Sequence, residues 1–317
     1  MVRFGIMGAG NIAHYFAKAV ADVEGAELTA VASKSAERAE AFAKEENIPH
    51  FYGDYEEMLR SGNVDAVYIA TTMNYHYENI LQCLNAGKHV LCEKCMVLTH
   101  KQAEEVFALA KQKGLFVMEA MWVRFLPKTQ KVLEWAKSGR IGKLKMAQAT
   151  LGFRAELDPH SRMYDPALGG GAMYDLGVYL IEVLSFFTEN ELTEIDLTVV
   201  RAFTGVDETV NLNLRYGDYL INGQCSIAAK LPENGYLYGE DGYIFIDYLH
   251  WGNTVRLYDK DRKLAEEYCQ PERNGFTYEV EEAVRCIEQG LLESKVASHK
   301  MTLDCCTIFD RCLGTAE

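Results

Sequence analysis

The first strand-like run of this chain leads directly into a glycine-rich turn, and that feature limits the possible folds more than any other. The apolar run Val2–Met7 is followed by GAGNIA at residues 8–13, and helical spacing continues through Asn11–Val20. The pattern G-x-G-x-x-G/A between a strand and a helix is typical of dinucleotide-binding folds. Its first glycine permits a tight turn, and its second lets the backbone approach a pyrophosphate at the helix N-terminus. We therefore predict that the cofactor phosphates are bound by Gly8, Gly10, Asn11 and Ile12.

Apolar runs continue to alternate with helical patterns over the first 120 residues or so. Further strands are expected at Glu27–Ser33, Asp65–Ala70, His89–Cys92 and Phe116–Met118. Helices are expected between them, at Ala36–Glu46, His76–Ala86 and Lys101–Lys113. Such alternation indicates a parallel sheet. It predicts an N-terminal Rossmann domain over residues 1–122.

The pattern changes after residue 122. Helices are expected at Pro127–Ser138, Ala172–Phe187 and Phe276–Gln289. The remaining stretches read as strands separated by turns: Lys145–Phe153, Asp196–Phe203, Thr209–Leu214, Tyr219–Ala228, Tyr243–Tyr248 and Val255–Tyr258. This favours an open, mainly antiparallel sheet. The fold class is therefore α/β, with a second, α+β domain over residues 123–317 for substrate binding and oligomerisation.

The end of the second strand distinguishes the two nicotinamide cofactors. NAD sites usually place an acidic residue there to hold the ribose hydroxyls. This chain instead has Ser33 and Lys34, with Arg38 one helical turn later. One hydroxyl and two cations suit a 2′-phosphate, so NADP is the expected cofactor, with NAD as the alternative.

Charge and cysteine content exclude several classes of function. The formal net charge is -14, which disfavours nucleic acid and anionic membranes as partners. No apolar run is long enough for a transmembrane helix. The nine cysteines read as free thiols in a reducing compartment, so we expect a cytoplasmic protein. Cys92 and Cys95 form an isolated CxxC without a second pair, and no metal site is expected.

A second string, AGKHVLCEK at residues 86–94, together with the N-terminal glycines, resembles the Gfo/Idh/MocA family of oxidoreductases. The resemblance implies that Lys94 lies beside the nicotinamide and is catalytic, and that Glu93 helps to hold the cofactor. The family's proline after this lysine is replaced by Cys95. The family segment that lines the nicotinamide ribose is matched, without its proline and with shorter spacing, by Thr71, Thr72, Asn74 and His76.

Two more segments are similar to the dihydrodiol dehydrogenase and glucose–fructose oxidoreductase branch. In EAMWVRFLP at 119–127, the resemblance implies cofactor contacts from Trp122 and Arg124, although Trp122 fits a core position at the domain boundary equally well. In GGGAMYDLGVY at 169–179, Tyr179 stands where many relatives have an acid/base histidine. Asp175 lies four residues before it, on the same helical face.

Tyr179 and Lys94 together suit hydride transfer from a carbinol, because one of them must take the proton of the hydroxyl group. An ordinary tyrosine, with a pKa of about 10, is a poor base, but a nearby ammonium such as Lys94 lowers that pKa. Asp175 would orient the substrate hydroxyl or Lys94. The substrate pocket is expected to include Arg124 and, facing the nicotinamide across the domain cleft, Phe153, Arg162 and Tyr164.

We therefore predict an NADP-dependent dehydrogenase or reductase acting on CH–OH groups of a sugar, a cyclic polyol or a trans-dihydrodiol. Two alternatives remain: a non-catalytic dinucleotide sensor, and a sugar-modifying enzyme with no net redox change. The substrate and the direction of reaction are open. Relatives pair through the open face of the second sheet, so a homodimer or a higher homo-oligomer with an apolar sheet face is expected.

Overall fold

The computed structural model describes residues 1–314, which form two compact units. The first contains residues 1–122 and 273–303, and the second contains residues 123–272 and 304–314. The break after Trp122 is where the sequence pattern changes. The segment 273–303, however, belongs with the first unit and not with the second domain of the sequence-based division. The reason is that helix α8 (Phe276–Glu288) packs against α1, β1 and β2.

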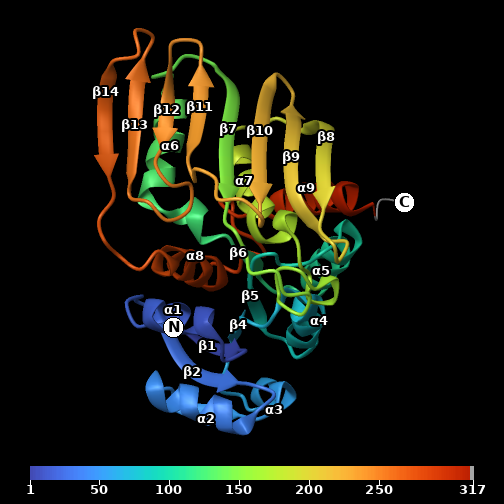
Figure 1. The fold of residues 1–317 in the computed structure, drawn as a ribbon. Helices are drawn as coiled ribbons and strands as arrows, with labels where there is room; N and C mark the ends of the chain where they lie inside the picture. The colour runs from blue at the N-terminus through green and yellow to red at the C-terminus, as the bar shows by residue number, and fades with distance from the viewer. Residues whose placement is uncertain (315–317) are drawn as a thin grey trace. The chain divides into compact units, whose positions relative to one another are not determined.

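The first unit is built on a parallel sheet with strand order β3-β2-β1-β4-β5-β6 (Figure 1). Its strands are β1 (Val2–Met7), β2 (Ala26–Ala32), β3 (His50–Tyr52), β4 (Ala66–Ile69), β5 (His89–Glu93) and β6 (Val117–Ala120). Its other helices are α1 (Asn11–Val20), α2 (Ala36–Glu45), α3 (Tyr55–Arg60), α4 (His76–Asn85) and α5 (His100–Lys113). This is the doubly wound order in which ligands bind where the chain direction switches, beyond the carboxyl ends of β1 and β4.

The sequence pattern did not reveal β3 and α3, because both are short. β3 has three residues, and α3 has six. A local signal was nevertheless present: Asp54 caps α3, its carboxylate accepting from the Glu57 backbone N–H at 3.0 Å. Such capping by Asp is a common helix start.

The second unit contains a mixed sheet with strand order β14-β13-β12-β11-β7-β10-β9-β8. Neighbouring strands run antiparallel except β7 and β10, which are parallel. The strands are β7 (Leu144–Gly152), β8 (Leu192–Arg201), β9 (Asp207–Tyr216), β10 (Tyr219–Ser226), β11 (Gly235–Gly239), β12 (Gly242–Ile246), β13 (Thr254–Asp259) and β14 (Leu264–Cys269). The sequence pattern had not indicated β11 or β14.

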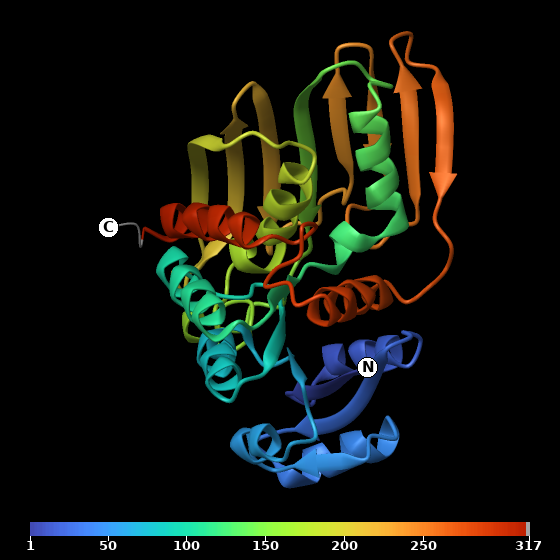
Figure 2. The same ribbon diagram turned by 180° about the vertical axis from the view of Figure 1, so that it is seen from behind.

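Helices cover one face of this second sheet. They are α6 (Pro127–Lys137) and α7 (Val178–Ser185), seen on the same side of the strands in Figure 2. The helix α9 (His299–Leu313) begins in the first unit and ends in the second. The segment Pro166–Ser185 is long and apolar enough to cross a membrane, but 89% of its apolar window is buried, as expected for a core helix.

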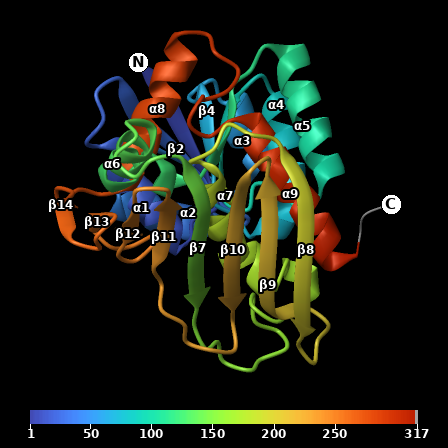
Figure 3. The same ribbon diagram turned by 90° about the horizontal axis from the view of Figure 1, so that it is seen from above.

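The opposite face of the second sheet is mixed in character and not uniformly apolar. Figure 3 shows its strands side by side. Strands β11 to β13 carry aromatic side chains, with the rings of Tyr243 and Tyr258 stacked at 4.6 Å. Strands β9 and β10 carry amides, and Asn222 donates to Asn213 at 2.7 Å. The expectation of an apolar face was therefore wrong for β9 and β10, where amide side chains replace apolar ones.

Candidate active site

The glycine-rich turn after β1 has the geometry of a phosphate cradle. Gly8 adopts a φ of 106°, and a side chain there would lie 2.8 Å from the carbonyl oxygen of Ala70. Gly10 begins α1 without a side-chain cap, and a Cβ on it would meet nothing within 4 Å. Ala13 is fully buried where α1 meets the sheet. These features fit a dinucleotide whose pyrophosphate approaches the helix N-terminus.

The end of β2 presents cations and a hydroxyl. Ser33 is buried, whereas Lys34 and Arg38 are exposed. The ammonium of Lys34 lies 3.8 Å from the centre of the Tyr75 ring. Ser35 caps α2 by accepting from the Arg38 backbone N–H at 3.3 Å. Tyr75 was not identified from the sequence, because only the fold brings the loop after β4 beside the end of β2.

The loop after β4 is held by internal hydrogen bonds. Thr71 Oγ1 donates to Asn79 at 2.9 Å, and Thr72 Oγ1 donates to Asn74 at 2.7 Å. The ring nitrogens of His76 lie 2.8 Å from the carbonyl oxygen of Cys95 and 3.0 Å from that of Thr71. Burial lowers the pKa of His76. His76 therefore ties this loop to the peptide that follows Lys94.

Glu93 and Lys94 stand at the end of β5, above a buried group of acids. The peptide between Lys94 and Cys95 is cis. Glu93 accepts from the Tyr68 hydroxyl and, at 3.3 Å, from the backbone N–H of Lys94. Burial raises the pKa of Glu93 to about 7.

A second acid lies close enough to Glu93 to interact with it electrostatically. Glu279, on α8, is fully buried, and neither carboxylate oxygen has a hydrogen-bond partner among the described residues. Burial, with Glu93 nearby, raises its pKa well above the ordinary range. Sequence analysis did not find Glu279, because α8 is more than 180 residues downstream of Glu93. Two buried carboxyl groups with raised pKa values, Glu93 and Glu279, therefore lie at this end of β5.

Trp122 closes an aromatic stack in the first unit. Its ring lies 5.5 Å from that of Phe276, which in turn lies 5.9 Å from that of Tyr15. Trp122 is 6% exposed, whereas Tyr15 is 50% exposed. This placement is compatible with both roles that the sequence left open, a core position and one wall of a cofactor site.

Arg124 is fully buried in the second unit. Its guanidinium donates to the carbonyl oxygen of Glu182 and lies 3.5 Å from the Glu182 carboxylate. Its Cζ atom also lies 5.3 Å from the centre of the Phe186 ring. These contacts anchor the helix α7, and the cofactor contact expected for Arg124 stays a prediction.

Asp175 and Tyr179 occupy two joined helical segments. A π-helical turn, Met173–Gly177, carries Asp175, and α7 follows with Tyr179 as its second residue. The sequence pattern had indicated one uninterrupted helix. Such π turns often occur at functional sites. Both side chains are largely buried, and Arg162 donates to the Asp175 carboxylate at 3.0 Å.

The glycine run before this helix is explained by Asp207, at the start of β9. The Asp207 carboxylate accepts from the Met173 backbone N–H at 2.5 Å. Gly171 has a φ of 129°, and a Cβ there would overlap Asp207 Oδ1. Burial raises the pKa of Asp207 to about 6. Asp207 thus positions the start of the helix that carries Asp175 and Tyr179, a role that sequence analysis missed.

The other residues predicted to contact substrate differ in their burial and in their aromatic neighbours. Phe153 is half-buried just after β7. Tyr164 is fully buried, its hydroxyl has no hydrogen-bond partner within residues 1–314, and its ring lies 5.6 Å from that of Phe203. Tyr179 stacks on His250 with ring centres 5.1 Å apart. His250 is a second residue that only the fold brings to this helix.

Cysteines and a group of possible metal ligands are also present in the described part of the chain. Cys92 and Cys95 are both buried thiols. A group with metal-ligand chemistry, which the sequence did not indicate, is formed by His14, Glu45 and Glu46 within residues 1–314. Its His14 Nδ1 lies 2.6 Å from the Glu46 carboxylate, within hydrogen-bond distance.

Comparison with protein families matches both parts of the chain. Residues 2–121 match the oxidoreductase family with an NAD-binding Rossmann fold, GFO/IDH/MocA. Residues 129–245 match the GFO/IDH/MocA C-terminal domain.

Curated relatives cover nearly the whole chain. Trans-1,2-dihydrobenzene-1,2-diol dehydrogenase of Mus musculus is 36% identical over 305 residues, which are 93% of this chain and 91% of that protein. The enzyme of the same name from Danio rerio is 33% identical, covering 94% and 92% of the two chains.

Two solved structures share the fold. A 3-ketoreductase from Actinomadura kijaniata in complex with NADP and TDP-benzene has a TM-score of 0.87 at 24% identity, covering 98% of this chain and 96% of that one. An aldose–aldose oxidoreductase from Caulobacter crescentus complexed with glycerol has a TM-score of 0.90 at 22% identity, covering 100% and 98%.

Proposed function

The chain belongs to the GFO/IDH/MocA family of NAD(P)-binding oxidoreductases, and from this premise we propose that it transfers a hydride between NADP and a CH–OH or carbonyl group of a sugar, a cyclic polyol or a trans-dihydrodiol. The observation that carries the proposal is the set of groups at the carboxyl edge of the parallel sheet. A glycine cradle follows β1, and Lys94 follows β5 at the same edge.

The bound nicotinamide would supply the acceptor or donor of the hydride. In the oxidative direction, Tyr179 takes the proton of the substrate hydroxyl while the hydride leaves the same carbon, so that a carbonyl forms. Lys94 stabilises the phenolate form of the tyrosine and makes it a usable base near neutral pH. In the reverse direction, Lys94 polarises the carbonyl and Tyr179 returns the proton.

The neighbours of each group support this division of roles. Burial raises the pKa values of Glu93 and Glu279, which favours the protonated form of each carboxyl group near Lys94. Protonated carboxyl groups do not neutralise an ammonium, so Lys94 can act on the substrate. In the second unit, Arg162 donates to Asp175, whose carboxylate can also accept from a substrate hydroxyl.

NADP is the proposed cofactor because the end of β2 carries no acid to hold a free ribose diol. Lys34 and Arg38 are both exposed, so they can reach a 2′-phosphate. The nearest acid, Glu37, accepts from the Ser35 hydroxyl at 2.7 Å. Thr72, Asn74 and Trp122 are proposed to contact the nicotinamide half, in line with the family resemblance.

A cytoplasmic homodimer completes the proposal. The uncovered face of the second sheet offers the aromatic side chains of β11 to β13 beside the amides of β9 and β10. An aromatic patch next to side-chain amides that can form hydrogen bonds with a partner suits a protein interface. Sedimentation at micromolar concentration should give a dimer, and a monomer would contradict this part.

The direct test is a turnover screen with NADP and NAD against sugars, inositols and trans-dihydrodiols, followed by absorbance of the reduced cofactor. Formation of NADPH with at least one CH–OH substrate is expected. Tight binding of NADP without turnover of any of these three substrate classes would favour a dinucleotide sensor instead.

A further inference from the structure

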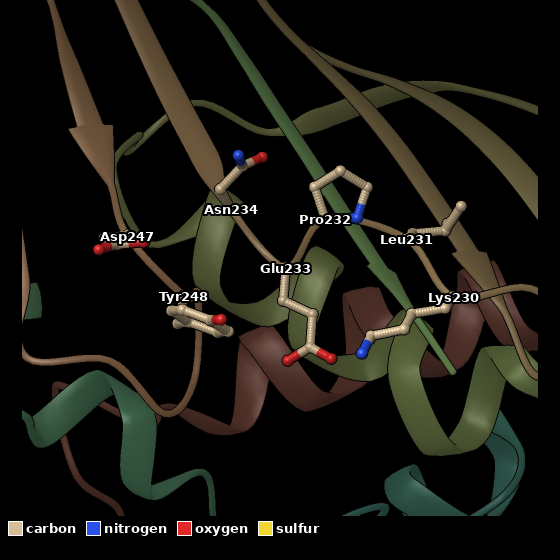
Figure 4. A pocket seen from close by; sticks show the side chains of 7 residues that line it. All are labelled: Lys230, Leu231, Pro232, Glu233, Asn234, Asp247 and Tyr248. Carbon is tan, nitrogen blue, oxygen red and sulfur yellow. The ribbon is translucent and has the colours of Figure 1, made fainter. Parts of the chain in front are cut away.

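A cavity in the second unit is not used by the mechanism above. Its volume is about 440 Å³, and it is lined by Lys230, Leu231, Pro232, Glu233, Asn234, Asp247 and Tyr248 (Figure 4). Small-molecule sites typically measure about 300–1,000 Å³. Size alone therefore permits a ligand.

Four polar side chains of this cavity are available to a ligand. The side chains of Lys230, Glu233, Asn234 and Asp247 make no hydrogen bond or ion pair in the part of the chain that the structure describes. Glu233, Asn234 and Asp247 are nevertheless half-buried. Figure 4 shows the Lys230 side chain extending toward the end of the Glu233 side chain, with the ring of Tyr248 on the other side of Glu233. Partly desolvated polar groups gathered around a cavity are the usual means of recognising a polar ligand.

Tyr248, which forms one wall of the cavity, has an unusual backbone conformation and is held by a buried lysine. Tyr248 has a φ of 50°, a left-handed conformation that is rare outside glycine, asparagine and aspartate, and its side chain is 52% exposed. The fully buried Lys128 donates to the Tyr248 carbonyl oxygen at 2.6 Å. Strained backbone of this kind often occurs at functional sites. The turn is therefore built to present the Tyr248 ring to solvent.

The same turn connects the cavity to the proposed acid/base residue. The Leu249 backbone N–H donates to the Glu233 carbonyl oxygen at 2.6 Å, which joins the two walls. The next residue, His250, stacks on Tyr179. The other wall is joined to the end of β7, because Leu231 N–H donates to the Gly152 carbonyl oxygen at 3.1 Å, next to Phe153. The cavity thus borders the helix end that carries Tyr179.

The charges and hydrogen-bonding groups that line the cavity favour one class of ligand over others. Two carboxylates and one ammonium leave no surplus of positive charge, so a phosphate or nucleotide group would find no counter-charge. A benzene dihydrodiol carries only two hydroxyl groups, so it would leave some of the carboxylates, the amide and the ammonium without partners, at a cost in free energy. Hydroxyl groups both donate and accept, so they can satisfy all four polar side chains while a ring face lies against Tyr248.

We propose that this cavity binds a second, uncharged hydroxylated ring of the substrate, so that the ring oxidised at Tyr179 is part of a disaccharide or similar glycoside. This inference rests on the proposed function, because it places the reacting ring at Tyr179. It narrows the substrate class from sugars, polyols and dihydrodiols to glycosides.

The test is a binding titration by calorimetry on the full chain saturated with NADPH, which cannot accept a hydride from the hydroxyl groups of the probes. The probes are glucose, three glucose disaccharides of different linkage (cellobiose, maltose and trehalose) and TDP-glucose. At least one disaccharide should bind about tenfold more tightly than glucose, the gain expected from one hydrogen bond to a charged group. Glu233→Gln and Tyr248→Ala should each remove most of that gain and leave glucose binding unchanged. Glu272→Gln, an exposed acid in the same unit, is the matched control and should keep the gain.

The inference is overturned if all three disaccharides bind no more tightly than glucose, if the gain survives both variants, or if TDP-glucose binds more tightly than every disaccharide. Binding is measured without turnover, so its result is separate from that of the activity screen. A disaccharide that binds through Glu233 and Tyr248 supports the cavity even where no NADPH forms, and that absence would count against hydride transfer alone. Turnover of small dihydrodiols with no disaccharide binding would keep the proposed function and reject the glycoside inference.

Discussion

Lys94 and Tyr179, which carry the proposed chemistry, stand in regions that are built in different ways. Lys94 follows a strand of a parallel sheet, and its backbone N–H bonds the adjacent Glu93. Tyr179 lies on a helix whose start is held by Asp207 and whose aromatic neighbour is His250, 28 and 71 positions away. The backbone at the first position has a hydrogen bond to its own neighbour in sequence, whereas both contacts of the second come from residues that only folding brings together. Damage to the scaffold should therefore affect the tyrosine more easily than the lysine.

The largest expected effect is loss of hydride transfer on changing either residue. Lys94→Ala removes the ammonium that stabilises the phenolate, and Tyr179→Phe removes the proton carrier. Each should lower the rate by about 100-fold or more, as general acid–base groups typically do. Single-turnover absorbance of NADPH measures this rate.

The double variant shows whether the two regions act together. Residues that act as a unit are strongly non-additive, so the double change should cost little beyond the worse single one. Dinucleotide binding should survive in Tyr179→Phe. Native hydride transfer in Tyr179→Phe would move the acid/base role to His76 or His160.

The next effect concerns the scaffold of the helix that carries Tyr179. Gly171→Ala would place a methyl group against the Asp207 carboxylate at a positive φ. Overpacking of this kind costs about 1–3 kcal/mol of unfolding free energy. Gly205→Ala is the matched control in the same unit, since Gly205 also has a positive φ but its Cβ would meet nothing within 4 Å. Urea unfolding measures the loss of unfolding free energy in each variant. Equal losses would show that the Asp207 carboxylate does not restrict the side chain at position 171.

A pH-dependent effect distinguishes the carboxyl cluster behind Lys94. Burial raises the pKa of Glu93 from 4.5 to about 7, so the folded chain keeps a proton that the unfolded chain has released. The stability contributed by this proton is fully present below pH 4.5 and is lost as the pH rises to 7, by up to about 1.4 kcal/mol per pH unit. Glu93→Gln should flatten this dependence in urea titrations from pH 5 to 7. The exposed Glu24→Gln should keep it, and an unchanged slope in Glu93→Gln would contradict the proposed protonation.

The smallest effect is expected at the exposed end of β2. Lys34→Asp replaces a cation by the acid typical of NAD sites, so it should weaken NADPH binding by about tenfold relative to NADH. Fluorescence titration of both cofactors measures the ratio. Lys44→Asp changes the same charge on the exposed face of α2 and should leave the ratio as it is. NADH binding as tight as NADPH binding in the unchanged chain would remove the basis for NADP.

The sequence predicted the parallel sheet and its cofactor turn well because their signals are local. The order of strand, glycine turn and helix appears within the first 20 residues, and β1 and α1 begin and end where the pattern placed them. Short elements escaped detection. β3 and β11 have three and five residues, too few for a clear period. The helix α8 was found, but its membership of the first unit was not, because packing partners leave no mark in a linear pattern.

By itself, then, the sequence determined the family, the α/β class, and the types of residue available for hydride transfer at Lys94 and Tyr179. Only the tertiary structure decided what surrounds them. It brought Glu279 to Glu93 and Asp207 to the start of the helix carrying Tyr179, and it opened the cavity beside Tyr248. The physical reason is that strand and helix periods, and motif residues, depend on neighbours within a few positions. Burial, charge neighbours and cavities depend on contacts between residues tens to hundreds of positions apart, which no local pattern encodes.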